Sequence, residues 1–156
     1  HELVYGGTSV GLMHELSEAV RAAGGRVTGV LPELFVERGL QDEHADELVV
    51  TPGMDGRKQE MIARADVFVA LPGGFGTLEE LLEVLTLKQL GYHRKPIVLL
   101  DVDGFWRGLL DFFQHLYDTR FAAPVYAELY HVASDVDDLF AHVAAYDPED
   151  LPTKWW

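Results

Sequence analysis

A glycine-rich stretch followed by two adjacent carboxylates is the segment of this sequence best suited to chemistry. It reads LPGGFGTLEE, residues 71–80, and it stands between the strand-like run ADVFVA and a run with helical spacing. Glycines at such a turn let the backbone approach a ligand closely. The start of a helix offers unpaired N–H groups and partial positive charge. Together these features are typical of an anion site, most often for phosphate. The residues that would form it are Gly73, Gly74, Gly76 and Thr77.

The spacing of these glycines leaves two interpretations open. The stretch is not a Walker A loop, because no lysine follows the last glycine, and its GGxG pattern differs from GxGxxG. A tight turn without a ligand explains the spacing about as well as phosphate binding does.

The two glutamates after the turn also have two interpretations. Thr77 and Glu80 match a capping box, in which Thr77 is the N-cap and Glu80 reaches back to its amide, and the pattern alone favours this structural role. Glu79 is expected on a solvated face of the helix, whereas Glu80 shares a partly apolar face with Val84. A carboxylate there, beside a bound phosphate, would be placed to stabilise an oxocarbenium-like centre or to activate a water, as in glycoside hydrolysis.

A basic pair lies at the start of an expected helix. Arg57 and Lys58 stand in GMDGRKQE, just after Met54 and the strand-like run LVVT, and the other adjacent basic pair is at residues 94–95. Ligands of open parallel sheets bind beyond the carboxyl ends of the strands, and arginine is the natural bidentate partner of phosphate. A surface ion pair is the alternative.

The elements that must position these residues alternate between strand and helix. Runs such as VFVAL and IVLL are apolar on both faces, which is typical of parallel strands covered on two sides. We therefore expect a doubly wound, three-layer α/β/α parallel sheet in one domain over residues 1–156. The expected strands are 2–7, 26–32, 48–51, 66–72, 95–101 and 130–132. The expected helices are 10–23, 54–65, 76–90, 104–117 and 136–145, with a loop or short helix over 33–47.

Composition excludes several classes of partner. A net charge of −14 would repel nucleic acid. No apolar run approaches the roughly 20 residues that span a bilayer, and no signal peptide is visible, so we expect no membrane partner and a cytoplasmic protein. The seven histidines are scattered and no pair has a zinc spacing such as HExxH.

Four stretches of the chain resemble the Lonely guy family. PGGFGTLEE fits the family motif PGGxGTxxE, and GRKQEMIARADVFVALPGG resembles its second motif. VYGGTSVGLMHELSEAVRAAGGRVTGVLPE resembles the N-terminal glycine region, and LKQLGYHRKPIVLLDVDGFWRGLLDFF resembles the downstream helix and strand. Members normally begin with a further strand and helix, which are missing here before His1, and we expect truncation or disorder to be the reason.

The resemblance implies a Rossmann-like homodimer that uses no cofactor. It would hydrolyse the N-glycosidic bond of nucleoside 5′-monophosphates, typically cytokinin riboside monophosphate or AMP, to free base and ribose 5-phosphate. The catalytic arginine of the family falls on Arg57 and its catalytic glutamate on Glu80. The phosphate loop falls on the glycines and threonine named above. The other ligand positions implied by the family are Gly6, Gly7, Met54, Lys58 and Glu79.

Other expectations concern rival functions and assembly. A non-catalytic nucleotide or molybdenum-cofactor carrier of the same superfamily is the alternative function. The name lysine decarboxylase, often given to this family, requires pyridoxal phosphate on a lysine, and of the four lysines only Lys58 has any candidate setting. Apolar excess in two helices suggests a dimer face, carried by Trp106, Phe112, Phe113 and Leu116, although ordinary core packing explains it as well.

Overall fold

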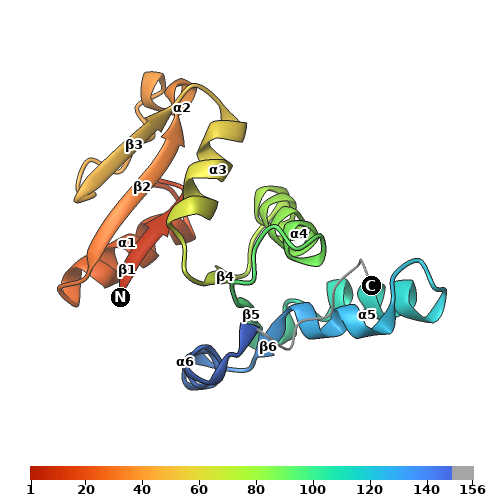
Figure 1. Cartoon of the computed structure of the whole chain (residues 1–156). Helices are drawn as coiled ribbons and strands as arrows, with labels where there is room; N and C mark the ends of the chain where they lie inside the picture. The colour runs from red at the N-terminus through yellow and green to blue at the C-terminus, as the bar shows by residue number, and fades with distance from the viewer. Residues whose placement is uncertain (149–156) are drawn as a thin grey trace. The chain divides into compact units, whose positions relative to one another are not determined.

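The structure is a computed structural model that describes residues 1–148, and its contacts divide the chain into two compact units. Unit 1 covers His1–Ala65 and unit 2 begins at Asp66. Each unit is an α/β arrangement with its own three-stranded parallel sheet (Figure 1). The units are therefore described one at a time.

Unit 1 holds a parallel sheet with strand order β1-β2-β3. Its elements in chain order are β1 (Glu2–Tyr5), α1 (Leu12–Ala22), β2 (Arg26–Pro32), α2 (Glu33–Glu37), β3 (Glu47–Thr51) and α3 (Met54–Arg64). The central strand β2 pairs Tyr5 of β1 with Gly29 and Thr51 of β3 with Pro32. Helices α1 and α3 both pack against β1 and β2 (Figure 1). Because β2 is covered in this way, Val27, Val30 and Leu31 have no exposed surface.

Unit 2 holds a second parallel sheet with strand order β4-β5-β6. Its elements are β4 (Phe68–Ala70), α4 (Phe75–Gln89), β5 (Ile97–Leu100), the 3-10 turns η1 (Val102–Gly104) and η2 (Pro124–Leu129), α5 (Arg107–Asp118), β6 (His131–Ala133) and α6 (Val136–Ala145). Strand β5 is the centre of this core, since Ile97, Val98 and Leu99 are fully buried. Trp106 is buried beside it and donates from Nε1 to the carbonyl of Leu100 at 3.2 Å.

The predicted class of alternating strands and helices with parallel sheets is confirmed. The six strands form two sheets of three within residues 1–148, so one continuous sheet in a single domain stays a prediction. Several boundaries differ from those expected. The helix predicted from residue 104 begins at Arg107, after the turn η1, and the helix predicted from residue 76 begins at Phe75.

The residues proposed as a dimer face divide into two groups. Trp106 and Phe113 belong to the core of unit 2, whereas Phe112 is 55% exposed on α5. Within residues 1–148 no helix is both long enough and apolar enough to cross a membrane.

Candidate functional site

The glycine turn after β1 packs against the guanidinium of Arg57 within unit 1. Arg57 lies in the first turns of α3, is only 6% exposed, and donates from Nε to the carbonyl of Val30 on β2 at 3.0 Å. A Cβ added to Gly6 would stand 2.3 Å from Nη2 of Arg57 and 2.8 Å from Sδ of Met13. These two side-chain ends would have to move to admit a Cβ, so glycine at position 6 allows the guanidinium to lie against the backbone of this turn.

Gly7 is required for a different reason. Its φ of +73° lies in the left-handed region that side chains disfavour, and an added Cβ would stand 3.0 Å from the amide nitrogen of Val30. Gly29 meets the same turn from β2, since its own added Cβ would stand 2.8 Å from Cα of Gly7. The two backbones therefore touch, and Gly6, Gly7 and Arg57 are brought together in one corner of unit 1.

The start of α3 is open to solvent. Met54 is 44% exposed, and a hollow of about 440 Å³ is lined by Pro52, Gly53, Met54, Asp55 and Gly56. Lys58 is half-buried one residue after Arg57. These positions follow the carboxyl end of β3, which is where the predicted ligand region was expected.

The glycine turn of unit 2 follows β4 and leads into α4, whose N-cap is Gly74. Gly73 is closely packed, because an added Cβ would stand 2.1 Å from Oγ1 and 2.8 Å from Cβ of Thr77. Added Cβ atoms at Gly74 and Gly76 would meet nothing within 4 Å. Packing therefore explains Gly73 but gives no reason for glycine at 74 and 76, where the bare backbone of the helix start faces open space.

The capping-box interpretation of Thr77 and Glu80 is wrong. Because Gly74 is the N-cap, Thr77 is the third residue of the helix and its hydroxyl lies over Gly73. Glu80 then falls in the second turn of α4 and is half-buried, whereas Glu79 is exposed. The capping-box pattern placed the N-cap at Thr77 instead of Gly74. A threonine three residues before a glutamate also occurs inside helices, so the pattern alone does not fix where a helix begins.

Lys88 and Lys95 of unit 2 each contact other groups of the protein. Lys88 is 3% exposed, donates from Nζ to the carbonyl of Leu129 at 2.7 Å, and lies over the ring of Tyr146. Burial lowers the pKa of Lys88 to about 8. Lys95 lies over the ring of Phe68, and Lys154 falls outside the described residues. That no lysine carries pyridoxal phosphate remains a prediction.

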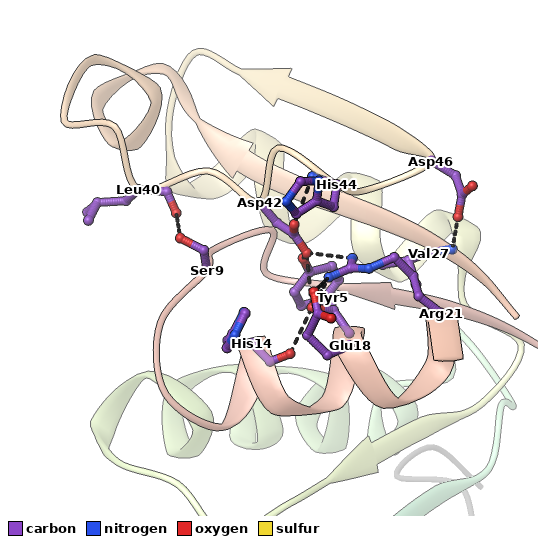
Figure 2. A network of polar contacts seen from close by, with 11 residues as sticks. Tyr5, Ser9, His14, Glu18, Arg21, Val27, Leu40, Asp42, His44 and Asp46 are labelled. Atoms are coloured by element: carbon purple, nitrogen blue, oxygen red, sulfur yellow. Dashed lines mark hydrogen bonds and ion pairs between the residues drawn. The ribbon is translucent and has the colours of Figure 1, made fainter. Parts of the chain in front are cut away.

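One polar cluster was not anticipated from the sequence. Tyr5, Ser17 and Arg21 all donate hydrogen bonds to the carboxylate of Asp42 (Figure 2). The backbone amide of Asp42 donates to the carbonyl of Gly7, which joins this cluster to the glycine turn. Ser17 and Arg21 lie one turn apart on α1, but Tyr5 and Asp42 come from distant parts of the chain, so the four residues form no local motif. The only available signal was a carboxylate in the acidic segment 33–47, which pattern reasoning treats as solvated surface.

The parallel α/β units, with glycine turns at the carboxyl ends of β1 and β4, define a Rossmann-like protein. The chain belongs to the Lonely guy family, whose family model bears the description "Possible lysine decarboxylase" and matches residues 13–143. The cytokinin riboside 5'-monophosphate phosphoribohydrolase LOG7 of Arabidopsis thaliana is 45% identical over 95% of this chain and 68% of its own length. LOG5 and LOG3 of the same plant, which share that enzyme name, are each 43% identical. This chain covers 64% of LOG5 and 72% of LOG3.

Two solved structures share the fold. The molybdenum cofactor carrier protein of Chlamydomonas reinhardtii is 32% identical, with a TM-score of 0.67 over 91% of this chain and 74% of its own. The molybdenum cofactor binding protein of Rippkaea orientalis has the same TM-score at 24% identity, over 92% of this chain and 76% of its own.

Proposed function

We propose that this chain hydrolyses the N-glycosidic bond of nucleoside 5′-monophosphates, such as cytokinin riboside monophosphate or AMP, to free base and ribose 5-phosphate. The observation that carries the proposal is the first two turns of α4, where two glycines without a packing role precede a half-buried glutamate. The reaction named for relatives that are 43–45% identical supports the choice of substrate.

The phosphate would bind at the turn from Gly73 to Thr77. The backbone amides at the start of α4 have no partners within the helix, and the helix dipole favours an anion there. Open space at Gly74 and Gly76 lets phosphate oxygens approach these amides. The Thr77 hydroxyl, close to Gly73, adds a donor on the same turn.

Arg57 would hold the ribose or the phosphate. Its Nε is tied to β2 and its guanidinium lies against Gly6, so the group is oriented before a ligand arrives. Orientation in advance lowers the entropy lost on binding. The further positions proposed to line the ligand are Gly6, Gly7, Met54, Lys58 and Glu79.

Glu80 would serve the bond-breaking step. As the C1′–N bond breaks, its electron pair leaves with the base and positive charge develops on C1′ and the ring oxygen. An ionised Glu80 would stabilise that charge or orient the water that adds to C1′. The water contributes hydroxide to the sugar, and its remaining proton balances the charge on the departing base.

The test is the variant Glu80→Gln beside the matched control Glu79→Gln. Glu80→Gln keeps the shape of the side chain and should lower kcat for AMP by about 100-fold or more, with AMP binding nearly unchanged. Glu79 is proposed to line the ligand but to take no part in bond breaking, so Glu79→Gln should retain most of kcat and any loss should appear in AMP binding. Released base and ribose 5-phosphate are measured by chromatography and binding by calorimetry. Full activity of Glu80→Gln would remove the catalytic assignment.

A non-catalytic carrier is the second candidate, and the shared fold with two molybdenum cofactor proteins favours it. It predicts tight binding of a nucleotide by the wild-type chain with no release of ribose 5-phosphate. We further propose that the protein is a homodimer, and sedimentation of a monomer alone would refute this.

A further inference from the structure

The buried residue Asp42 is hydrogen-bonded to the glycine turn Gly6–Ser9 of unit 1. Asp42 is 3% exposed, and its Oδ2 accepts hydrogen bonds from the Tyr5 hydroxyl at 2.6 Å, the Ser17 hydroxyl at 2.9 Å and the Arg21 guanidinium at 2.8 Å. Its Oδ1 accepts from the backbone amide of His44 at 3.0 Å. Figure 2 shows these donors converging on Asp42 from β1, from α1 and from its own segment.

The segment that carries Asp42 runs alongside the glycine turn. The amide of Asp42 donates to the carbonyl of Gly7 at 2.8 Å, and the amide of Ser9 donates to the carbonyl of Leu40 at 3.0 Å. Between these bonds Thr8 and Gln41 form an isolated antiparallel bridge. The turn Gly6–Ser9 is therefore paired to residues 40–42, and the carboxylate of Asp42 fixes that segment to the body of the unit.

The hydrogen bonds to Asp42 favour its ionised form. Burial disfavours the ionised carboxylate, but the hydrogen bonds from Tyr5, Arg21, the His44 amide and Ser17 together outweigh it and hold the pKa of Asp42 far below its usual value. Burial and the bond to Asp42 raise the pKa of Tyr5 to about 12, so the phenol remains a donor at neutral pH. Arg21 also pairs with Glu18 on α1, which orients the guanidinium.

We propose that Asp42 is a positioning residue for the sugar-phosphate end of the substrate. It fixes Gly7 through its own amide, and Gly7 in turn fixes Gly6, against which the Arg57 guanidinium packs. Asp42 touches no substrate in this scheme. The inference rests on the proposed function, which places the Gly6–Gly7 turn and Arg57 at the ligand. Asp42 is inferred to hold these two groups in position.

The experiment compares Asp42→Asn with Asp46→Asn. Asp46 is a matched control because it lies on the same segment and accepts a backbone hydrogen bond, from Val27 at 2.8 Å, at the far end of β2 (Figure 2). Dissociation constants of AMP and adenosine are measured by calorimetry, and amide exchange over residues 6–9 by mass spectrometry. Tyr5→Phe, which removes a single bond to Asp42, keeps the test decisive if Asp42→Asn does not fold.

Asp42→Asn should speed exchange in the turn and lower the preference for AMP over adenosine by about tenfold. Tyr5→Phe should shift both readouts in the same direction by less, and Asp46→Asn should leave both unchanged. An unchanged preference in Asp42→Asn, or an equal loss in Asp46→Asn, would overturn the positioning role. If the wild-type chain binds AMP but releases no base, the proposed hydrolysis is refuted and the role of Asp42 is not. The preference for AMP over adenosine still tests that role.

Discussion

The variant Gly76→Ala distinguishes most clearly between a structural role and a ligand-binding role of the glycine turn Gly73–Thr77. Gly76 is the second residue of α4, and a Cβ built on it meets nothing within 4 Å. Alanine is a better helix former than glycine by up to about 1 kcal/mol. Gly76→Ala should therefore keep or raise stability, with the melting temperature higher by up to about 4 °C.

The same methyl group would stand where the phosphate is proposed to bind. Losing one charge-assisted hydrogen bond costs about 1.5–3 kcal/mol, which corresponds to a rise in KM for AMP of about 10-fold to 100-fold. Gly73→Ala is the contrast, because its Cβ would stand 2.1 Å from Oγ1 of Thr77. That clash should destabilise the protein by about 1–3 kcal/mol whether or not a ligand binds there.

The assay measures release of base from AMP and from adenosine, together with thermal unfolding of each variant. Gly76→Ala should lose activity on AMP while its residual activity on adenosine stays the same, because adenosine has no phosphate to displace. A Gly76→Ala protein that is stable and fully active on AMP would show that the phosphate does not bind over this turn.

Three further predictions follow from named contacts. Arg57→Lys keeps the charge but loses the bond to Val30 and the planar fork, so kcat/KM for AMP should fall by about 100-fold or more; an unchanged value would refute the role of Arg57. Because the pKa of Lys88 is lowered to about 8, wild-type stability should rise between about pH 8 and pH 10 as the amine loses its proton in the folded state first. Lys88→Met should remove roughly 1–3 kcal/mol of that rise in urea unfolding, and an identical slope in both proteins would contradict the assignment. The lowered pKa of Asp42 gives stability that is complete above about pH 4 and lost at lower pH. Asp42→Asn should therefore be about 3 kcal/mol less stable at neutral pH, with a gap that closes in acid, and a gap independent of pH would count against the ion pair.

Local pattern was enough to place most of the elements. The helix Val136–Ala145 and the strand Arg26–Pro32 were predicted to the residue, because each has a sharp boundary. Asp135 caps α6 by accepting a bond from the amide of Asp138, and glycines and a proline bound the strand. The strand β4 is shorter than expected at both ends, and at its carboxyl end Pro72 has no N–H to offer a neighbouring strand.

The polar cluster around Asp42 could not be predicted in the same way. Tyr5 and Asp42 are 37 residues apart, and their bond depends on the register between β1 and β2 and on the path of the segment after α2. Sequence periodicity reports which face of one element is apolar, but it does not report which polar groups from several elements meet. The acidic residues around Asp42 made it look like surface, while the fold buries it.

The misplaced helix start has a consequence for Glu80. A capping box would have explained Thr77 and Glu80 by local structure alone, and no ligand would be needed for either. With Gly74 as the N-cap, Thr77 instead packs over Gly73, and Glu80 stands one turn beyond the capping positions. The capping box is therefore excluded as the reason for Glu80, and the half-buried carboxylate keeps the catalytic role proposed for it, which the variant Glu80→Gln tests.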